Sequence, residues 1–269
     1  MSWALVTGGS RGIGAAISEA LAKRKQNLML VARNQKDLAD ISERLQMIYG
    51  IRVQILSCDL KEETAVEELI QWIEAGGESL NIFCHVAGMG GAKDFGTLSP
   101  DEMKIMIRTN FERGVELCWR LVPLLRKNAP AHILLVGSMA GFAPVPQKAI
   151  YSATKSAVYF FSRSLNQILK NDRIEVSCLS PGPVFTKSSI KQETIKQLGK
   201  TGEWMALSPD QIGETAIRQM LKGKPLIVPG KLNQFISALM RTLPHSLLMK
   251  LFSRRLNDHS PKEEGTGRL

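Results

Sequence analysis

Two residues that could move a proton stand four positions apart in the sequence. Tyr151 and Lys155 lie in A-I-Y-S-A-T-K-S-A-V, and residues spaced by four share one face of a helix. A phenol with a pKa of about 10 is a poor acid or base at neutral pH unless its surroundings shift that value. A neighbouring cation would shift it downward. The same spacing also fits an ordinary helix face, so the pair needs support from the rest of the chain.

A glycine-rich stretch near the amino terminus is the second candidate. T-G-G-S-R-G-I-G (7–14) follows the apolar run W-A-L-V-T and precedes a helix-type pattern. In such a strand-to-helix turn, backbone N–H groups approach a pyrophosphate at the helix N-terminus. A plain structural turn is the alternative, but the setting within a βαβ unit favours nucleotide binding. The residues expected here are Gly8, Ser10, Arg11, Gly12, Ile13 and Gly14.

The residues at the end of the second apolar run indicate which of two dinucleotides, NAD(H) or NADP(H), the chain would bind. An NAD site places an acid there to accept a hydrogen bond from the ribose 2′-OH, whereas this run ends in Val31-Ala32-Arg33-Asn34. Arg33, with Arg11 on the other side, suits a 2′-phosphate, and Asn34 lies at the same place. The alternative for Arg33 alone is a solvated side chain at a strand end. Together the two arginines favour NADP(H).

The elements that must position these residues alternate along the chain. Near-continuous apolar runs are separated by segments of 3.6-residue periodicity, which indicates a parallel sheet covered by helices on both faces. We therefore expect an α/β fold with one Rossmann domain, a doubly wound parallel sheet of about seven strands. Ser99 and Ser208 each precede Pro and mark helix starts. The expected strands are 3–7, 27–32, 52–57, 81–87, 133–138, 175–180 and 225–229.

Length, composition and charge are consistent with a globular protein in the cytoplasm. The 269 residues are 44% hydrophobic and 22% charged, with no apolar run of about 18 residues and no pattern of a secretory signal. The four cysteines form no C-x-x-C pair, so we expect reduced core thiols and no metal site. The net charge is +10, and Thr215 to Asn257 contains eight Lys or Arg and no Asp or Glu.

Taken together, these motifs resemble the short-chain dehydrogenase/reductase family, from Trp3 to about Gly230. The T-G-x-x-x-G-x-G turn, the Y-x-x-x-K pair, and Ser138, 13 residues before Tyr151, all match its pattern. The resemblance implies an NADP(H)-dependent oxidoreductase that acts on CH-OH or C=O groups. It identifies Ser138, Tyr151, Lys155 and Asn110 as the catalytic set.

Each of these residues has an implied role. Hydride transfer to a carbonyl carbon builds negative charge on the oxygen, and Tyr151 would protonate it. Lys155 would lower the pKa of Tyr151 and hold the nicotinamide ribose. Ser138 would hydrogen-bond the same oxygen. Asn110 would position a water in a proton relay to Lys155, or is simply a buried helix asparagine.

Further positions match the family's cofactor contacts one by one. Asp59 and Leu60 match a pair that contacts adenine, although Asp59 could also cap the following helix. Ala87 and Gly88 keep a close backbone approach to the cofactor. The segment P-G-P-V-F-T matches the part that packs on the nicotinamide, and Val184 and Thr186 would bind its carboxamide. The positions expected to contact the cofactor here, besides Tyr151 and Lys155, are Asp59, Leu60, Ala87, Gly88, Pro181, Gly182, Val184 and Thr186.

The sequence departs from the family pattern in two places. His85-Val86 replaces the usual Asn-Asn before Ala87, and we expect His85 to be a structural strand-end residue rather than a proton donor. The chain also continues for about forty residues beyond L-I-V-P-G, where many 3-oxoacyl-carrier-protein reductases end. That continuation is more similar to branches that reduce lipophilic ketones. We expect half of an apolar set to line the pocket, namely Met89, Met139, Phe142, Val145, Phe185, Trp204 and Met205.

The extension divides the chain into a catalytic domain, 1–230, and a basic amphipathic segment with a polar tail, 231–269. Residues 231–257 predict two short helices broken at Pro244. Their apolar face either packs on the domain or a second subunit, or contacts an anionic membrane or an acidic acyl carrier. We also expect a small carbonyl or alcohol substrate, a homodimer or homotetramer, and no nucleic acid. A catalytically silent NADP(H)-binding regulatory protein is the alternative function.

Overall fold

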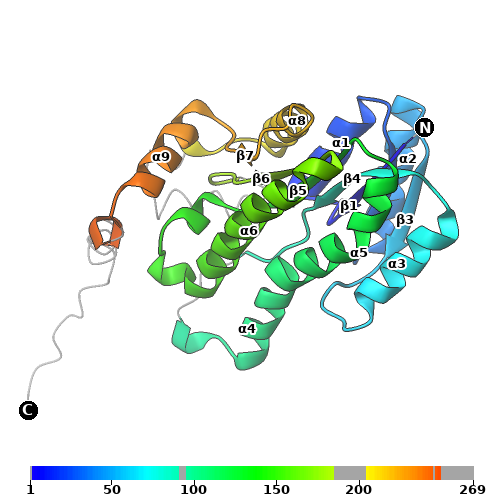
Figure 1. The fold of residues 1–269 in the computed structure, drawn as a ribbon. Helices are drawn as coiled ribbons and strands as arrows, with labels where there is room; N and C mark the ends of the chain where they lie inside the picture. Colours follow the sequence, from blue (N-terminus) through cyan, green and yellow to red (C-terminus); the bar gives the residue numbers. More distant parts are fainter. Residues whose placement is uncertain (1, 91–94, 185–203, 245, 250–269) are drawn as a thin grey trace, which may run out of the picture.

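The centre of the molecule is one parallel sheet of seven strands. The structure is a computed structural model that describes residues 2–90, 95–184, 204–244 and 246–249. The strands lie in the order β3-β2-β1-β4-β5-β6-β7, and every neighbouring pair is parallel (Figure 1). They are β1 (Trp3–Thr7), β2 (Asn27–Ala32), β3 (Val53–Ser57), β4 (Leu80–His85), β5 (Ala131–Val136), β6 (Ile174–Leu179) and β7 (Leu226–Ile227).

The central strands are apolar throughout because helices cover both faces of the sheet. Along β1, Trp3 and Leu5 pack into one core cluster, while Ala4 and Val6 pack into the other. Side chains alternate between the faces of a strand, so a strand buried on both sides needs an uninterrupted apolar run. The predicted doubly wound α/β fold with a single domain is therefore confirmed.

Within the described residues, three helices cover each face of the sheet. One face carries α3 (Ala65–Gly76), α5 (Arg113–Lys127) and α6 (Ala149–Ile168). The other carries α1 (Gly12–Ala22), α2 (Gln35–Tyr49) and α8 (Pro209–Met220). The remaining elements are α4 (Pro100–Ile107), α9 (Lys231–Thr242), a π-helical turn η2 (Arg108–Glu112), and the 3-10 turns η1 (Phe95–Thr97), η3 (Met139–Phe142), η4 (Pro146–Lys148) and η5 (Lys170–Asp172).

Both predicted helix starts are confirmed. The Ser99 hydroxyl accepts from the Glu102 N–H at the start of α4, and the Ser208 hydroxyl accepts from the Gln211 N–H at the start of α8. In each case the third helical side chain accepts from the cap residue's own N–H, which completes a capping box. The four cysteines are buried and free, as expected.

Strand ends differ by a few residues from the prediction. β5 ends at Val136, two residues before Ser138, because the Ser138 hydroxyl accepts from the Ala140 N–H and turns the chain into η3. β7 spans only Leu226–Ile227. Val228, Pro229 and Gly230 follow, of which the first two are buried, and they lead directly into α9. A local side-chain hydrogen bond such as that of Ser138 competes with continued strand pairing.

The topology brings the candidate site residues to one edge of the sheet. β1 and β4 are neighbours, and the chain winds outward from them in opposite directions. Ligands of doubly wound sheets bind outside the carboxyl ends of the strands at this reversal. The glycine turn follows β1, His85 to Gly88 follow β4, Ser138 follows β5, and Pro181 to Val184 follow β6.

Candidate active site

The glycine turn is packed so tightly that side chains would not fit. Gly8 has φ +70°, and a Cβ there would lie 2.8 Å from the Ala87 nitrogen. A Cβ on Gly14 would lie 1.9 Å from the Gly8 oxygen, so the first turn of α1 rests on the end of β1. The turn therefore presents the amino end of an 11-residue helix at the edge of the sheet. That bare backbone cradle fits the pyrophosphate of a dinucleotide.

Two arginines lie at the far end of this cradle, and an acid pairs with one of them. Arg11 occupies the N-cap position of α1, and its Nη2 donates to Asp37 Oδ1 at 2.8 Å. Arg33 is exposed, and among the described residues it makes no ion pair. Asn34, expected as a cofactor contact, caps α2 by accepting from the Asp37 N–H at 3.1 Å. The cap was missed in the sequence, although Asn three residues before Asp is its usual signal.

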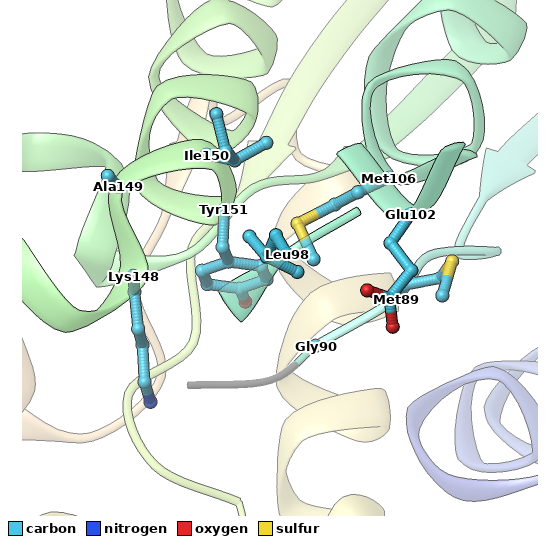
Figure 2. A pocket seen from close by; sticks show the side chains of 9 residues that line it. All are labelled: Met89, Gly90, Leu98, Glu102, Met106, Lys148, Ala149, Ile150 and Tyr151. Atoms are coloured by element: carbon cyan, nitrogen blue, oxygen red, sulfur yellow. The ribbon is translucent and has the colours of Figure 1, made fainter. Parts of the chain in front are cut away.

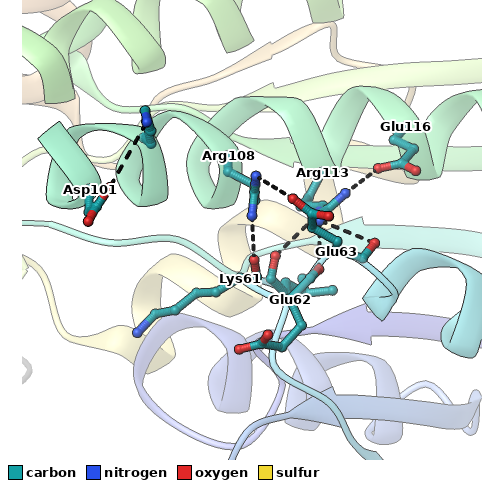
Figure 3. Close-up of polar contacts among 9 residues, drawn as sticks. Lys61, Glu62, Glu63, Asp101, Arg108, Arg113 and Glu116 are labelled. Atoms are coloured by element: carbon teal, nitrogen blue, oxygen red, sulfur yellow. Dashed lines mark hydrogen bonds and ion pairs between the residues drawn. The ribbon is translucent and has the colours of Figure 1, made fainter.

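The segment after β3 is fixed by a buried arginine that the sequence did not single out. Asp59 Oδ1 accepts from the Lys61 N–H, while the following helix is capped at Thr64, so Asp59 closes a local turn instead. Leu60 is buried. Arg113 of α5 donates to the Leu60 oxygen at 3.1 Å and to the Glu62 oxygen at 2.6 Å (Figure 3). Arg113 thus holds the backbone that the family resemblance assigns to adenine.

The serine, tyrosine and lysine come together from two elements. Ser138 follows β5 directly, whereas Tyr151 and Lys155 lie one turn apart on α6. The Lys155 ammonium donates to the Val136 oxygen at 2.8 Å and lies 5.8 Å from the centre of the Tyr151 ring. Lys155 is buried, so the bond to the strand end fixes its position. The same hydrogen bond ties α6 to the end of β5, two residues before Ser138.

Burial changes the acid–base properties of both α6 residues. Burial raises the pKa of Tyr151, and hydrogen bonding with the Ser138 side chain opposes that shift. Burial lowers the pKa of Lys155 to about 8, and the nearby Cys178 thiol opposes that shift. Each change disfavours the charged form of its group, as expected for removal from water. Groups with such shifted pKa values gather at functional sites.

Asn110 lies in the π-helical turn η2, which directs its amide toward the same place. Its Oδ1 accepts from the Met89 N–H at 2.6 Å, and its Nδ2 donates to the Met89 oxygen at 3.0 Å. The Nδ2 also donates to Thr154 Oγ1 on α6 at 3.2 Å. A single π-helical turn inside a helix often marks a functional position. Asn110 therefore joins the segment after β4 to the helix that carries Tyr151 and Lys155.

His85 is held inside the sheet edge and stays neutral. Its Nδ1 lies 2.9 Å from Thr7 Oγ1, across the β1–β4 pair. Burial, together with the charge of Lys155, lowers the pKa of His85 to about 4. The Thr7 hydroxyl also accepts from the Val86 N–H at 3.3 Å. The His–Thr pair thus connects the two strands where an Asn-Asn sequence is usual in the family.

The segment after β6 is anchored at both of its described ends. The Pro181 oxygen accepts from the Met139 N–H, and Val184 forms a parallel bridge with Leu207. A Cβ on Gly182 would lie 2.9 Å from the amide of Asn233 in α9, so this glycine permits close packing. Thr186 and Phe185 lie outside the described residues.

A pocket opens beside Tyr151. It is a small pocket of about 90 Å³ that is partly open to solvent, and it is smaller than most small-molecule sites. Figure 2 shows Tyr151 between Lys148 on one side and Met106, Glu102 and Met89 on the other. Its lining is Met89, Gly90, Leu98, Glu102, Met106, Lys148, Ala149, Ile150 and Tyr151.

The pocket differs from the apolar set expected from the sequence. Among the members of that set that the structure describes, only Met89 lines it. Met139 and Phe142 are buried in a small core with Val228, against Ile236 and Met240 of α9. Trp204 is exposed. Residues of α4 take the expected places instead, because α4 lies against α6, a long-range contact that no local spacing indicates.

None of the described helices combines the length and apolar character that a bilayer-spanning segment needs. Within the described ranges, no three His, Cys, Asp or Glu side chains converge as metal ligands would.

Comparison with known proteins identifies the family. A dehydrogenase/reductase SDR family protein 7-like from Drosophila melanogaster is 28% identical over 259 residues, which cover 93% of this chain and 79% of that protein. The very-long-chain 3-oxoacyl-CoA reductase of Bos taurus is 27% identical over 261 residues, covering 93% and 78%. An alcohol dehydrogenase from the archaeon Thermococcus sibiricus, solved with 5-hydroxy-NADP, matches with a TM-score of 0.73 at 27% identity, covering 85% and 95%. The family model for short chain dehydrogenases matches residues 2–197, so the chain belongs to the short-chain dehydrogenase family of oxidoreductases.

Proposed function

We propose that the protein is an NADPH-dependent carbonyl reductase that also works in reverse as an alcohol dehydrogenase. The observation that carries this proposal is the position of Tyr151. Its side chain lines a pocket, while Ser138 interacts with it and Lys155 is fixed on the same helix face. A nicotinamide dinucleotide, when bound, supplies or accepts the hydride.

The chain's own residues would handle the oxygen and its proton. Tyr151 gives its phenolic proton to the carbonyl oxygen, and Ser138 donates a hydrogen bond to the same oxygen. The Ser138 hydrogen bond opposes the effect of burial on the Tyr151 pKa. The nearby Lys155 cation would stabilise the phenolate left on Tyr151 by its charge. Asn110 holds the Met89 backbone and α6 in place. In oxidation the proton moves in the opposite direction, from the alcohol oxygen to Tyr151.

We propose NADP(H) as the cofactor. Support comes from the exposed Arg33 after β2, from Arg11 in the glycine turn, and from the absence of an acid at the end of β2. The Thermococcus sibiricus relative was solved with an NADP derivative. The glycine turn would hold the pyrophosphate, and the backbone of Ala87 to Gly88 and Pro181 to Val184 would hold the nicotinamide end.

The substrate proposed is a lipophilic ketone or its alcohol, including acyl compounds. Support comes from the pocket lining, where Met89, Leu98, Met106 and Ile150 supply thioether and hydrocarbon surface. The Bos taurus relative is named for a very-long-chain 3-oxoacyl-CoA substrate. The discriminating assay offers purified protein NADPH with matched short and long aliphatic ketones and follows the loss of reduced nicotinamide. Tight NADPH binding without turnover on such a panel would instead favour a silent regulatory protein.

We propose a homodimer or homotetramer whose contacts include α5 and α6. Trp119 on α5 and Phe160 and Ile168 on α6 are 65–73% exposed, which is unusual for such large apolar side chains. Light scattering after gel filtration gives the mass directly. Trp119→Lys should shift that mass toward the monomer, and a mass unchanged in both proteins would reject this surface.

We propose that 231–269 forms an extension to the catalytic domain, 1–230, and that its first helix contacts an anionic membrane. On α9, Asn233 and Ser237 are buried against the domain, whereas Leu232, Phe235 and Leu239 are exposed. Leu247 is exposed as well. The stretch 231–257 has cations and no Asp or Glu, and an outward apolar stripe in such a stretch suits an anionic lipid surface.

Co-sedimentation with vesicles tests this contact. Binding is expected with phosphatidylserine vesicles at low salt, weaker at high salt, and absent with neutral vesicles. Phe235→Ser with Leu239→Ser should abolish it, whereas Met47→Ser with Ile48→Ser, two exposed apolar positions on α2, should not. If the parent protein stays in the supernatant with anionic vesicles at low salt, the membrane assignment is wrong, and an acidic acyl carrier becomes the next partner to titrate.

A further inference from the structure

The amino ends of α1 and α2 are joined by a two-point ion pair between Arg11 and Asp37. Arg11 Nη2 donates to Asp37 Oδ1 at 2.8 Å, and Arg11 Nε lies 2.5 Å from Asp37 Oδ2. The Arg11 side chain is 70% exposed and that of Asp37 is 18% exposed. Two parallel contacts of this kind fix the plane of a guanidinium. One edge of Arg11 is therefore occupied at the place where the proposed function puts a 2′-phosphate.

The position of Asp37 is set by its own helix. Asn34 caps α2 and accepts from the Asp37 N–H at 3.1 Å. Asp37 is the third helical residue, where a carboxylate interacts favourably with the helix dipole. Arg33 immediately precedes the cap. The acid therefore stays beside the two arginines whether or not Arg11 turns toward another anion.

We propose that Asp37 competes with the cofactor's 2′-phosphate for Arg11 and so limits how strongly the chain prefers NADP(H) over NAD(H). This inference rests on the proposed function. A 2′-phosphate carries a charge of about −1.5 to −2. It must share Arg11 with a carboxylate that repels it. NAD(H) has a hydroxyl at that position, which meets no such repulsion and can donate a hydrogen bond to an acid.

The charge count at this corner gives the direction of the effect. Arg11 and Arg33 contribute +2 and Asp37 contributes −1, so the three groups sum to +1. Asp37→Asn raises that sum to +2 with nearly the same side-chain shape. The variant keeps an amide oxygen near Arg11 but removes the competing charge. Binding of the dianionic phosphate should become tighter, and binding of the hydroxyl form should hardly change.

The test is a binding titration with NADPH, NADH and 2′,5′-ADP, which needs no substrate or turnover. Asp37→Asn should bind NADPH and 2′,5′-ADP about three- to tenfold more tightly at low salt, and NADH within about twofold of the parent. The gain should shrink as salt is raised, because exposed charges are screened. A thermal melt of each variant checks that α2 remains folded.

Two control variants isolate the contact from the general charge. Asp40→Asn removes the same charge one turn further along α2, where the carboxylate is exposed and, within the described residues, makes no ion pair. It should change each affinity by less than about twofold. In an Arg11→Ala background, Asp37→Asn should give little or no gain, because the competition is gone.

Three results would overturn the inference while leaving the proposed function intact. The first is weaker NADPH binding in Asp37→Asn, which would mean that Asp37 orients Arg11 instead of competing for it. The second is an equal gain in NADPH affinity from Asp40→Asn. The third is an unchanged NADPH affinity in every variant. A parent protein that binds neither NADPH nor 2′,5′-ADP would overturn the proposed cofactor itself.

Discussion

The two ends of the proposed cofactor site differ in how far their charged groups are removed from water. At the catalytic end, Lys155 is buried and bonded to a strand end, and its pKa is lowered to about 8. At the phosphate end, Arg11 and Arg33 stand in solvent, and Arg11 is held by one acid. Buried groups interact strongly and exposed ones weakly. The buried catalytic end therefore suits a change in the protonation of its side chains, whereas the exposed phosphate end suits a modest adjustment of cofactor affinity.

The largest expected effect is at Tyr151. Tyr151→Phe removes the proposed proton donor and keeps the ring that lines the pocket, so turnover should fall by about 10²- to 10⁴-fold. NADPH affinity should stay within a few-fold. Tyr159→Phe, two turns along α6 and packed on Phe142, is the matched control and should keep nearly full activity. More than about a tenth of the parent rate in Tyr151→Phe would mean that another group donates the proton.

The second largest effect is expected on NADPH affinity, at the exposed end of the site where Arg33 lies. Arg33→Ala should weaken NADPH binding by roughly ten- to a hundredfold, because it removes a charge-assisted contact to the 2′-phosphate. NADH affinity should barely change. Lys36→Ala, an equal loss of charge from the first turn of α2, serves as the control. Equal weakening of both cofactors in Arg33→Ala would assign the residue a structural role and leave the NADP(H) preference to Arg11.

The pH profile sharpens the comparison at the buried end. Lys155 is cationic below a pKa of about 8 and neutral above it, so kcat/KM for ketone reduction should fall about tenfold per pH unit above 8. Burial raises the pKa of Tyr151 from its ordinary value near 10, so loss of its proton comes later. Lys155→Arg should move the alkaline limb upward, whatever its absolute rate. A flat profile between pH 7 and 10 would show that catalysis does not use the Lys155 cation.

The fold and the meeting of Ser138, Tyr151 and Lys155 at one place could be predicted because they depend on local patterns. Apolar runs, capping boxes and the spacing of Ser138, Tyr151 and Lys155 are written along the chain, and the sheet brings their ends together. What the sequence did not reveal depends on contacts between distant segments. Arg113 reaches the Leu60 oxygen across 53 residues, and Asp37 reaches Arg11 across 26. Arg113 belongs to no motif, and the helix-cap signal that contains Asp37 does not indicate its contact with Arg11.

The pocket shows the same limit. Met139 and Phe142 have the size and polarity of pocket residues, but α9 packs on them and buries them in a separate small core. Met106 and Leu98 reach the pocket because α4 lies against α6. Apolar character alone does not say which cavity a side chain enters. That choice is made by packing between helices, which becomes visible only in the folded chain.

The smallest expected effect concerns stability rather than turnover, and it lies at His85. Burial lowers its folded pKa to about 4, whereas an unfolded histidine titrates near 6.5, so the unfolded chain binds the extra proton first. A folded pKa below the unfolded value gives stability that is complete above about pH 6.5 and is lost as the pH falls toward 4. From pH 6.5 to 5 the free energy of unfolding should decrease by about 1–2 kcal/mol through this residue.

The variant His85→Asn tests this effect. Asparagine, the residue usual in the family at this position, does not titrate, so the unfolding free energy of the variant should vary less with pH over this range. Urea unfolding at several pH values measures both slopes. His132→Asn is measured beside them, because burial also lowers the pKa of His132 and its share of the pH dependence must be separated. Parallel slopes in the parent and His85→Asn would show that the buried His–Thr pair contributes nothing to acid sensitivity.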